Sequence, residues 1–181
     1  NIMTNAAYKA GNILIKDFRE VENLQVSKKG IGDFVTSADL SSEKTIIKIL
    51  QKGYPEIEIM SEETNSETNL NEHEKIWIID PLDGTLNFLH GLPHFAISMA
   101  LMVNEEIISG IIYDPIKDEL FWAEKGIGAF LNGKRIRVSA RSRLKDALVS
   151  TGIPWKGMES SHKNYLKTVS IKKQVITAEV Q

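Results

Sequence analysis

The 181-residue chain contains no cysteine, which excludes disulfide bonds and thiolate metal sites. It also lacks an excess of charge of one sign, because 22 Lys and Arg stand against 24 Asp and Glu, for a formal net charge of −2. That balance provides neither a basic footprint for nucleic acid nor an acidic tail. No apolar run approaches the length of a membrane span. We therefore expect a soluble, cytoplasmic protein with no membrane association, whose partner is a small molecule.

The hydrophobic pattern predicts two helices followed by many strands. Apolar residues recur at helical spacing from Thr4 to about Val21. A second helix is predicted from about Ser37 to Lys52, with four apolar residues buried: Leu40, Ile46, Ile47 and Leu50. Strands are predicted at 57–60, 76–79, 94–103, 107–113, 120–123 and 129–136, the last of these a hairpin with an Asn-Gly turn. A further strand is predicted from Leu148 and a weak helix over 160–175. This order favours a layered α+β fold.

The chemistry-bearing stretch lies at the centre of the chain. Ile76–Ile79 predicts a short buried strand that ends at Asp80. The following proline keeps Asp80 extended, and Asp83 with Gly84 forms a turn signal, so the two carboxylates converge. Such a pair is stable mainly when a hard cation such as Mg²⁺ binds between them. Because Gly84 has no side chain, the N–H groups of Gly84 and Thr85 are open to an anion. The stretch therefore predicts a metal and phosphate site.

Spacing separates this interpretation from its rivals. A calcium loop counted from Asp80 would have Leu82 and Gly91 where acidic ligands are required. An aspartyl-phosphate nucleophile two residues before Asp83 is replaced by Pro81. His90 and His94 have zinc-helix spacing, but a glycine and a proline between them break the helix. An ordinary loop between two elements remains open as the alternative.

Two further acidic positions are conditional candidates. Glu62 and Glu63 follow the strand at 57–60, just as Asp80 follows the next strand. If those strands are neighbours, Glu62 and Asp80 face one metal; otherwise the Glu-Glu pair is a solvated turn. Asp39 falls in the first turn of the second helix, where the helix dipole alone favours a carboxylate.

Four segments together resemble the inositol monophosphatase family: Gly32–Asp39, Ser61–Thr64, Trp77–Phe88 and Gly126–Gly133. The resemblance runs in order from the first helix to about residue 155. It implies a layered α/β/α/β sandwich of the sugar-phosphatase type. It also implies Mg²⁺-dependent hydrolysis of a small phosphate monoester, most often inositol 1-phosphate, with Li⁺ sensitivity and a homodimer.

The resemblance also implies roles for individual residues. Glu62, Asp80 and the main-chain oxygen of Leu82 would hold a first metal, and Asp80 with Asp83 would help to hold a second. Asp39 and Thr85 would be catalytic, because Thr85 hydrogen-bonded to Asp39 orients and helps to deprotonate the attacking water. The implied substrate-binding residues are Glu62, Leu82, Asp83, Gly84, Thr85 and Lys28. Lys28 matches a basic residue of a mobile loop, here Ser27–Asp33, in which Lys29 competes for the role.

One departure from the family pattern concerns the C-terminal part. The family carries a second metal motif, a Trp-Asp pair, whereas the three tryptophans here precede Ile78, Ala123 and Lys156. We therefore expect residues 1–145 to form an N-terminal lobe with the metal and phosphate site, and 146–181 to begin an incomplete C-terminal lobe. Two alternatives stay open. One is a non-catalytic regulatory protein of the same family, with the transcription or ribosome machinery or nucleic acid as partner, and the other is a phosphatase of another sugar or nucleotide phosphate.

Overall fold

The computed structural model describes residues 2–20, 26–28, 34–63 and 74–148. The chain divides into two compact units. The first combines Asn1–Lys28 with Phe34–Ile136 and includes all the α-helices and β-strands described below. The second combines Lys29–Asp33 with Arg137–Gln181, and its described part contains the short 3₁₀ turn η3, Leu144–Asp146. The predicted lobe boundary after residue 145 remains a prediction.

Two long helices form one layer, as predicted. Helix α1 runs over Ile2–Phe18 and helix α2 over Ser37–Gly53. Small buried residues of α1, among them Ala6, Ala10 and Gly11, bring the two helices and the sheet close together. A Cβ at Gly11 would lie only 2.6 Å from the ring of Tyr113 in the sheet, so the helix approaches the strand more closely than a larger residue allows. None of the helices in the described ranges is long and apolar enough to cross a membrane.

The second layer is a seven-stranded sheet whose spatial order follows the chain. Its strands are β3 (Glu58–Ser61), β4 (Lys75–Asp83), β5 (Ala96–Val103), β6 (Glu106–Asp114), β7 (Glu119–Glu124), β8 (Gly128–Leu131) and β9 (Lys134–Ile136). Strands β3 and β4 are parallel, and every later neighbouring pair is antiparallel. Asn132 and Gly133 turn between β8 and β9 with φ of 47° and 78°. These positive values are typical of the predicted Asn-Gly hairpin, and the α+β fold class is confirmed.

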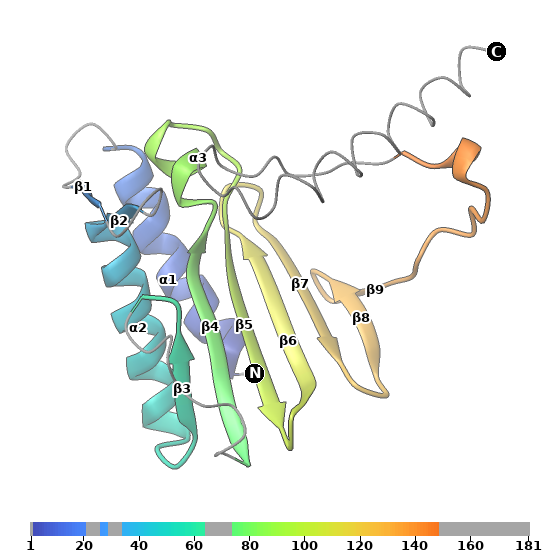
Figure 1. The fold of residues 1–181 in the computed structure, drawn as a ribbon, viewed down its shortest axis with the longest axis horizontal. Helices are drawn as coiled ribbons and strands as arrows, with labels where there is room; N and C mark the ends of the chain where they lie inside the picture. Colours follow the sequence, from blue (N-terminus) through green and yellow to red (C-terminus); the bar gives the residue numbers. More distant parts are fainter. Residues whose placement is uncertain (1, 21–25, 29–33, 64–73, 149–181) are drawn as a thin grey trace. The chain divides into compact units, whose positions relative to one another are not determined.

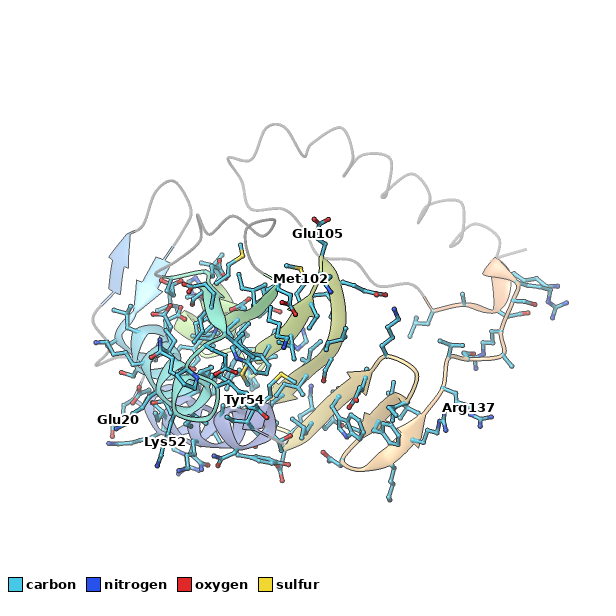
Figure 2. The ribbon with its side chains drawn as sticks, turned by 90° about the horizontal axis from the view of Figure 1, so that it is seen from below. Glu20, Lys52, Tyr54, Met102, Glu105 and Arg137 are labelled. Carbon is cyan, nitrogen blue, oxygen red and sulfur yellow. The ribbon has the colours of Figure 1, made fainter. Side chains whose placement is uncertain are left out.

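The helices lie on one face of the sheet (Figure 1). Figure 2 views the layers from the end at which α2 finishes, where Lys52 and the following Tyr54 are labelled, and side chains fill the space between helices and strands. The core there includes Leu14 of α1, Ile46 and Leu50 of α2, and Ile79 and Met99 of the sheet. Burial of such apolar surface stabilises the two-layer arrangement.

Strand β4 extends further than the sequence predicted. We expected Asp80 to end the strand, but Asp80 pairs with Ser98 and the ladder resumes where Asp83 pairs with Ala96. The prediction was wrong because the pairing register shifts between Asp80 and Asp83. A bulge of this kind accommodates Pro81, which has no N–H to give to a ladder.

The predicted loop beginning at Ser27 is also corrected. Strand β1 (Val26–Lys28) pairs antiparallel with β2 (Phe34–Thr36), and Lys28 lies opposite Phe34. Backbone pairing with the later segment, which local sequence does not reveal, extends the chain here. Four other predicted segments lie outside the described residues: the remainder of that loop, the polar segment 65–73, the strand from Leu148 beyond its first residue, and the helix over 160–175.

Candidate active site

Four parts of the chain lie together at one end of the sheet: the carboxyl ends of β3 and β4, the first turn of α2 and the short helix α3 (Thr85–Leu89) (Figure 1). Ser61 pairs with Ile79 in the parallel ladder. The N–H of Glu62 donates to the carbonyl oxygen of Ile79 at 3.3 Å. The condition set for Glu62 is thus met, because it follows a strand that directly neighbours the strand of Asp80.

Asp80 lies close to two other carboxylates, those of Glu62 and Asp83. Burial raises its pKa to about 7, helped by repulsion from Glu62 and Asp83 and by a hydrogen bond with Glu62. The N–H of Leu82 donates to Asp80 Oδ1 at 3.1 Å, which opposes this rise only in part. A carboxyl that titrates near neutral pH beside two other acids is typical of a functional site.

Asp39 is buried in the first turn of α2, with 2% of its surface exposed. Burial raises its pKa to about 8, and the charges of four acids add to the rise: Glu63, Asp80, Glu62 and Glu43. The favourable helix dipole therefore does not explain Asp39, because burial and acidic neighbours outweigh it. Asp39 and Asp80 belong to one acidic cluster drawn from a helix and two strands.

The raised pKa values of Asp39 and Asp80 predict how the stability of the metal-free chain depends on pH. Asp39 has a folded pKa of about 8 against an ordinary 3.8, so between these pH values it holds its proton in the folded state and loses it on unfolding. Its contribution is complete below pH 4 and disappears as pH rises to 8. In EDTA, the free energy of unfolding should therefore fall between pH 5 and 8, by up to about 1.4 kcal/mol per pH unit for each such carboxyl. Urea unfolding at four pH values measures this slope.

Asp39→Asn should flatten that slope, whereas Glu124→Gln, a change at an exposed position of β7, should leave it unchanged. Stability that rises over the same pH range in the parent would contradict the expected protonation of the cluster.

Thr85 begins α3 beside this cluster. Its Oγ1 lies 3.0 Å from the carbonyl oxygen of Leu82 and 3.5 Å from Asp39 Oδ2. A hydroxyl has a single proton, so the shorter contact to Leu82 takes the donated hydrogen bond. The Thr85–Asp39 pair implied by the resemblance is present as a longer contact.

Gly84 allows the turn that places Thr85. Its φ is 90°, a left-handed value that favours glycine. A Cβ there would lie 3.0 Å from the carbonyl oxygen of His94 and 3.3 Å from Phe95 Cα. The Asn87 side-chain amide also donates to the His94 carbonyl at 2.8 Å. The segment before β5 is thus packed directly against the Gly84 backbone.

Gly84→Ala should lower the free energy of unfolding by about 1–3 kcal/mol, the scale of a strained backbone position. The reason is twofold, since alanine disfavours this φ and its methyl group meets backbone atoms that cannot rotate away. Urea unfolding of the variant measures the loss. Gly91→Ala is the matched control, because Gly91 has a positive φ of 67° with nothing near its Cβ position. Equal losses in both variants would contradict the close-packing part of the argument.

The oxygen atoms gathered at this site are of the kind that a hard cation binds. Glu62, Asp80 and Asp83 offer carboxylate oxygens and Leu82 a carbonyl oxygen, the ligands that Mg²⁺ takes in proteins. No group of three acidic or histidine side chains that could hold a metal is found within the described ranges. The acids nevertheless interact as pairs through Asp80, with Glu62 and with Asp83, and a cation would relieve their repulsion. The residues therefore fit Mg²⁺ by donor type.

Of the predicted site residues, the structure brings seven together: Asp39, Glu62, Asp80, Leu82, Asp83, Gly84 and Thr85. For Lys28 the structure describes the backbone, which lies in β1, and the partner strand β2 contacts α3. Two hollows border the acids. One of about 330 Å³ is lined in part by Glu62 and Asp80, and one of about 400 Å³ in part by Asp83.

Sequence reasoning missed three buried polar residues next to the site, Ser42, Glu43 and Ser61. It assigned the buried stripe of α2 to apolar residues, but Leu40 and Ile47 are only half-buried. The available signal was the spacing of Asp39, Ser42 and Glu43, which places three polar side chains on one face of the helix.

Comparison with known proteins identifies relatives in sequence and in structure. An inositol-1-monophosphatase of Rhizobium meliloti is 48% identical over 166 residues, which make up 92% of this chain and 62% of that protein. The Nus factor SuhB of Haemophilus influenzae is 43% identical over 156 residues, or 86% of this chain and 58% of that protein. The solved extragenic suppressor protein suhB of Bartonella henselae shares the fold with a TM-score of 0.85 at 45% identity, covering 98% of this chain and 66% of that one.

This chain spans about three fifths of the length of these curated relatives. The profile of the inositol monophosphatase family matches residues 1–179. Since that match covers nearly every residue, the chain belongs to the inositol monophosphatase family.

Proposed function

We propose that this chain carries the metal- and phosphate-binding part of a Mg²⁺-dependent hydrolase of small phosphate monoesters, with inositol 1-phosphate as the leading substrate. The observation that carries the proposal is the acidic cluster around Asp80, contributed by two adjacent strands and a helix beside a glycine turn. The relative named inositol-1-monophosphatase, 48% identical, supports the substrate class. Sensitivity to Li⁺, a homodimer and a cytoplasmic location belong to the same proposal.

The proposed ligands of a first Mg²⁺ are Glu62, Asp80 and the carbonyl oxygen of Leu82, and Asp80 with Asp83 would help to hold a second. Bound metal supplies neutralisation of phosphate charge and a water of lowered pKa. Asp80 would belong to both sets, and the mutual repulsion of Asp80 with Glu62 and with Asp83, seen in its raised pKa, supports this placement. Glu62, Leu82 and Asp83 would border the substrate as well.

The remaining residues would bind phosphate and handle the proton of the attacking water. The N–H groups of Gly84 and Thr85 would donate to the phosphate oxygens from the left-handed turn at Gly84, where the absence of a side chain lets an anion approach the backbone. Thr85 Oγ1 donates to the Leu82 carbonyl in this structure; by donating instead to Asp39 Oδ2, 3.5 Å away, it would accept a hydrogen bond from the attacking water, orient it and help to deprotonate it. In the metal-free chain the raised pKa of Asp39, about 8, keeps this carboxyl protonated at neutral pH, and the positive charge of bound Mg²⁺ would lower that pKa so that Asp39 can accept a proton. Lys28 would add a positive charge from the β1–β2 hairpin.

Release of inorganic phosphate from inositol 1-phosphate by the 181-residue chain, with and without Mg²⁺, tests the proposal. Asp83→Ala should slow Mg²⁺-dependent turnover by about 10²-fold or more, the scale of losing one key electrostatic contact. Asp83 is exposed at the end of β4, so its removal leaves the core intact. Full turnover in this variant would show that the assignment of Asp83 is wrong.

A second candidate function follows from the relatives named Nus factor SuhB, 43% identical in Haemophilus influenzae and 41% in Escherichia coli. A regulatory protein of this kind would bind a component of the transcription machinery without hydrolysis. A phosphatase assay separates the two candidates. Absence of Mg²⁺-dependent release across inositol, sugar and nucleotide monophosphates would favour the regulatory role.

A further inference from the structure

Ser42 of α2 is fully buried, with 0% of its surface exposed, in an otherwise closely packed layer. Its Oγ donates to the carbonyl oxygen of Pro81 at 2.9 Å. Pro81 lies in the part of β4 where the register shifts, between the positions at which Asp80 and Asp83 pair with β5. The helix thus supplies a hydrogen bond to backbone that the interrupted ladder does not pair regularly. The next carbonyl along the chain is that of Leu82, a proposed metal ligand.

Glu43 of the same helix turn makes an equivalent contact with the other strand. It is 1% exposed, and its Oε1 accepts a hydrogen bond from the buried hydroxyl of Ser61. Ser61 ends β3, and the residue after it is Glu62. Glu62 lies in the turn after β3, but its N–H still pairs with the Ile79 carbonyl, so a Ser61 side chain held toward the helix leaves the next side chain to point to the opposite side. That side also carries the hollow that Glu62 and Asp80 line.

These two contacts come from a single turn of one helix. Asp39, Ser42 and Glu43 have the i, i+3 and i+4 spacing that places side chains on one face. Each reaches a different part of the candidate site: Thr85, the Pro81 carbonyl and Ser61. The Ser42 hydroxyl satisfies a backbone carbonyl, whereas Glu43 and Ser61 pair side chain to side chain and could be replaced by an apolar pair of the same size at little cost. Stability alone therefore gives no reason for the polar pair Glu43–Ser61.

We propose that Ser42 and Glu43 are positioning residues, which hold the ends of β4 and β3 so that the Leu82 carbonyl and the Glu62 carboxylate face one point. The inference rests on the proposed function for the identity of the ligand, a divalent cation, but the placement of the strand ends can be measured without metal.

Residue-resolved amide hydrogen exchange of the whole chain in EDTA tests the placement. Ser42→Ala should reduce the protection of the Leu82 amide, which donates to Asp80 Oδ1, by about 10-fold relative to the protection of core strand amides. Glu43→Met should do the same for the Glu62 amide, which donates to the Ile79 carbonyl. Glu43→Gln should restore it, because its amide oxygen can still accept from Ser61. Ser41→Ala is the matched control, since Ser41 donates only within its own helix, to the Ser37 carbonyl at 2.7 Å.

Calorimetric titration with Mg²⁺ alone tests the consequence. Loss of an outer-shell partner typically weakens metal affinity 10- to 100-fold. Ser42→Ala and Glu43→Met should show a loss of this size, and Ser41→Ala and Glu43→Gln a change of less than two-fold. Unchanged exchange at Leu82 and Glu62, or equal losses in Ser42→Ala and Ser41→Ala, would overturn the positioning role. If exchange changes in Ser42→Ala and Glu43→Met while the parent chain binds no Mg²⁺, the positioning role is supported and the proposed function is overturned.

Discussion

Asp80→Asn should reduce Mg²⁺-dependent phosphate release by about 10²- to 10³-fold, the range seen when one preorganised electrostatic contact is lost. Asp80 is the acid on which both neighbouring carboxylates act, since Glu62 and Asp83 each raise its pKa. Asparagine keeps the shape of the side chain and an oxygen that accepts the N–H of Leu82. The substitution therefore removes the negative charge and leaves the local backbone contact in place. Turnover and Mg²⁺ titration calorimetry, measured on the same samples, report the effect.

The control is Glu124→Gln, which removes one negative charge from an exposed position of β7. It should leave turnover and Mg²⁺ affinity within two-fold of the parent. Asp80→Asn should also be at least as stable as the parent in EDTA near pH 8, because it relieves repulsion within the cluster. Mg²⁺ affinity that survives in Asp80→Asn would remove Asp80 from the centre of the site.

Local patterns were enough to predict the elements that carry the site. Periodicity located both long helices and the sheet strands, and the Asn132-Gly133 pair located a hairpin, because each of these signals arises within a short stretch of chain. The meeting of Glu62 with Asp80 depended on whether β3 and β4 are neighbours, and the sequence could only state that condition. The parallel pairing of Ser61 with Ile79 satisfies it.

What the sequence could not predict depends on contacts between distant segments. The extension of β4 past Asp80 requires β5 to resume pairing at Ala96, and strand β1 requires the later segment at Phe34–Thr36. Ser42 and Glu43 read as ordinary polar helix residues until Pro81 and Ser61 are found opposite them. A single residue's type does not reveal a partner 18 or 39 positions away.

Three aromatic rings pack together next to the turn that carries Gly84 and Thr85. Phe88 of α3 is fully buried, with ring centroids of Phe18 and Phe95 at 5.4 and 5.0 Å, and those two rings are 5.1 Å apart. The rings come from the end of α1, from the helix after the glycine turn and from the segment before β5. The turn at Gly84 and Thr85 is thus joined to the core through the side chain that follows it by one helical turn.

Phe88→Ala should lower the free energy of unfolding by about 3–5 kcal/mol, because it removes a buried ring and leaves a cavity between three elements. Phe130→Ala is the matched control, since that ring stacks on Trp122 at 4.1 Å but is only half-buried, and its loss should cost clearly less. Phe88→Leu refills much of the space and should recover most of the stability. Urea unfolding of the three variants gives the comparison. Equal losses for Phe88→Ala and Phe130→Ala would mean that the aromatic cluster does not anchor the turn, and α3 would then depend on the contacts of Gly84 and Asn87 with His94.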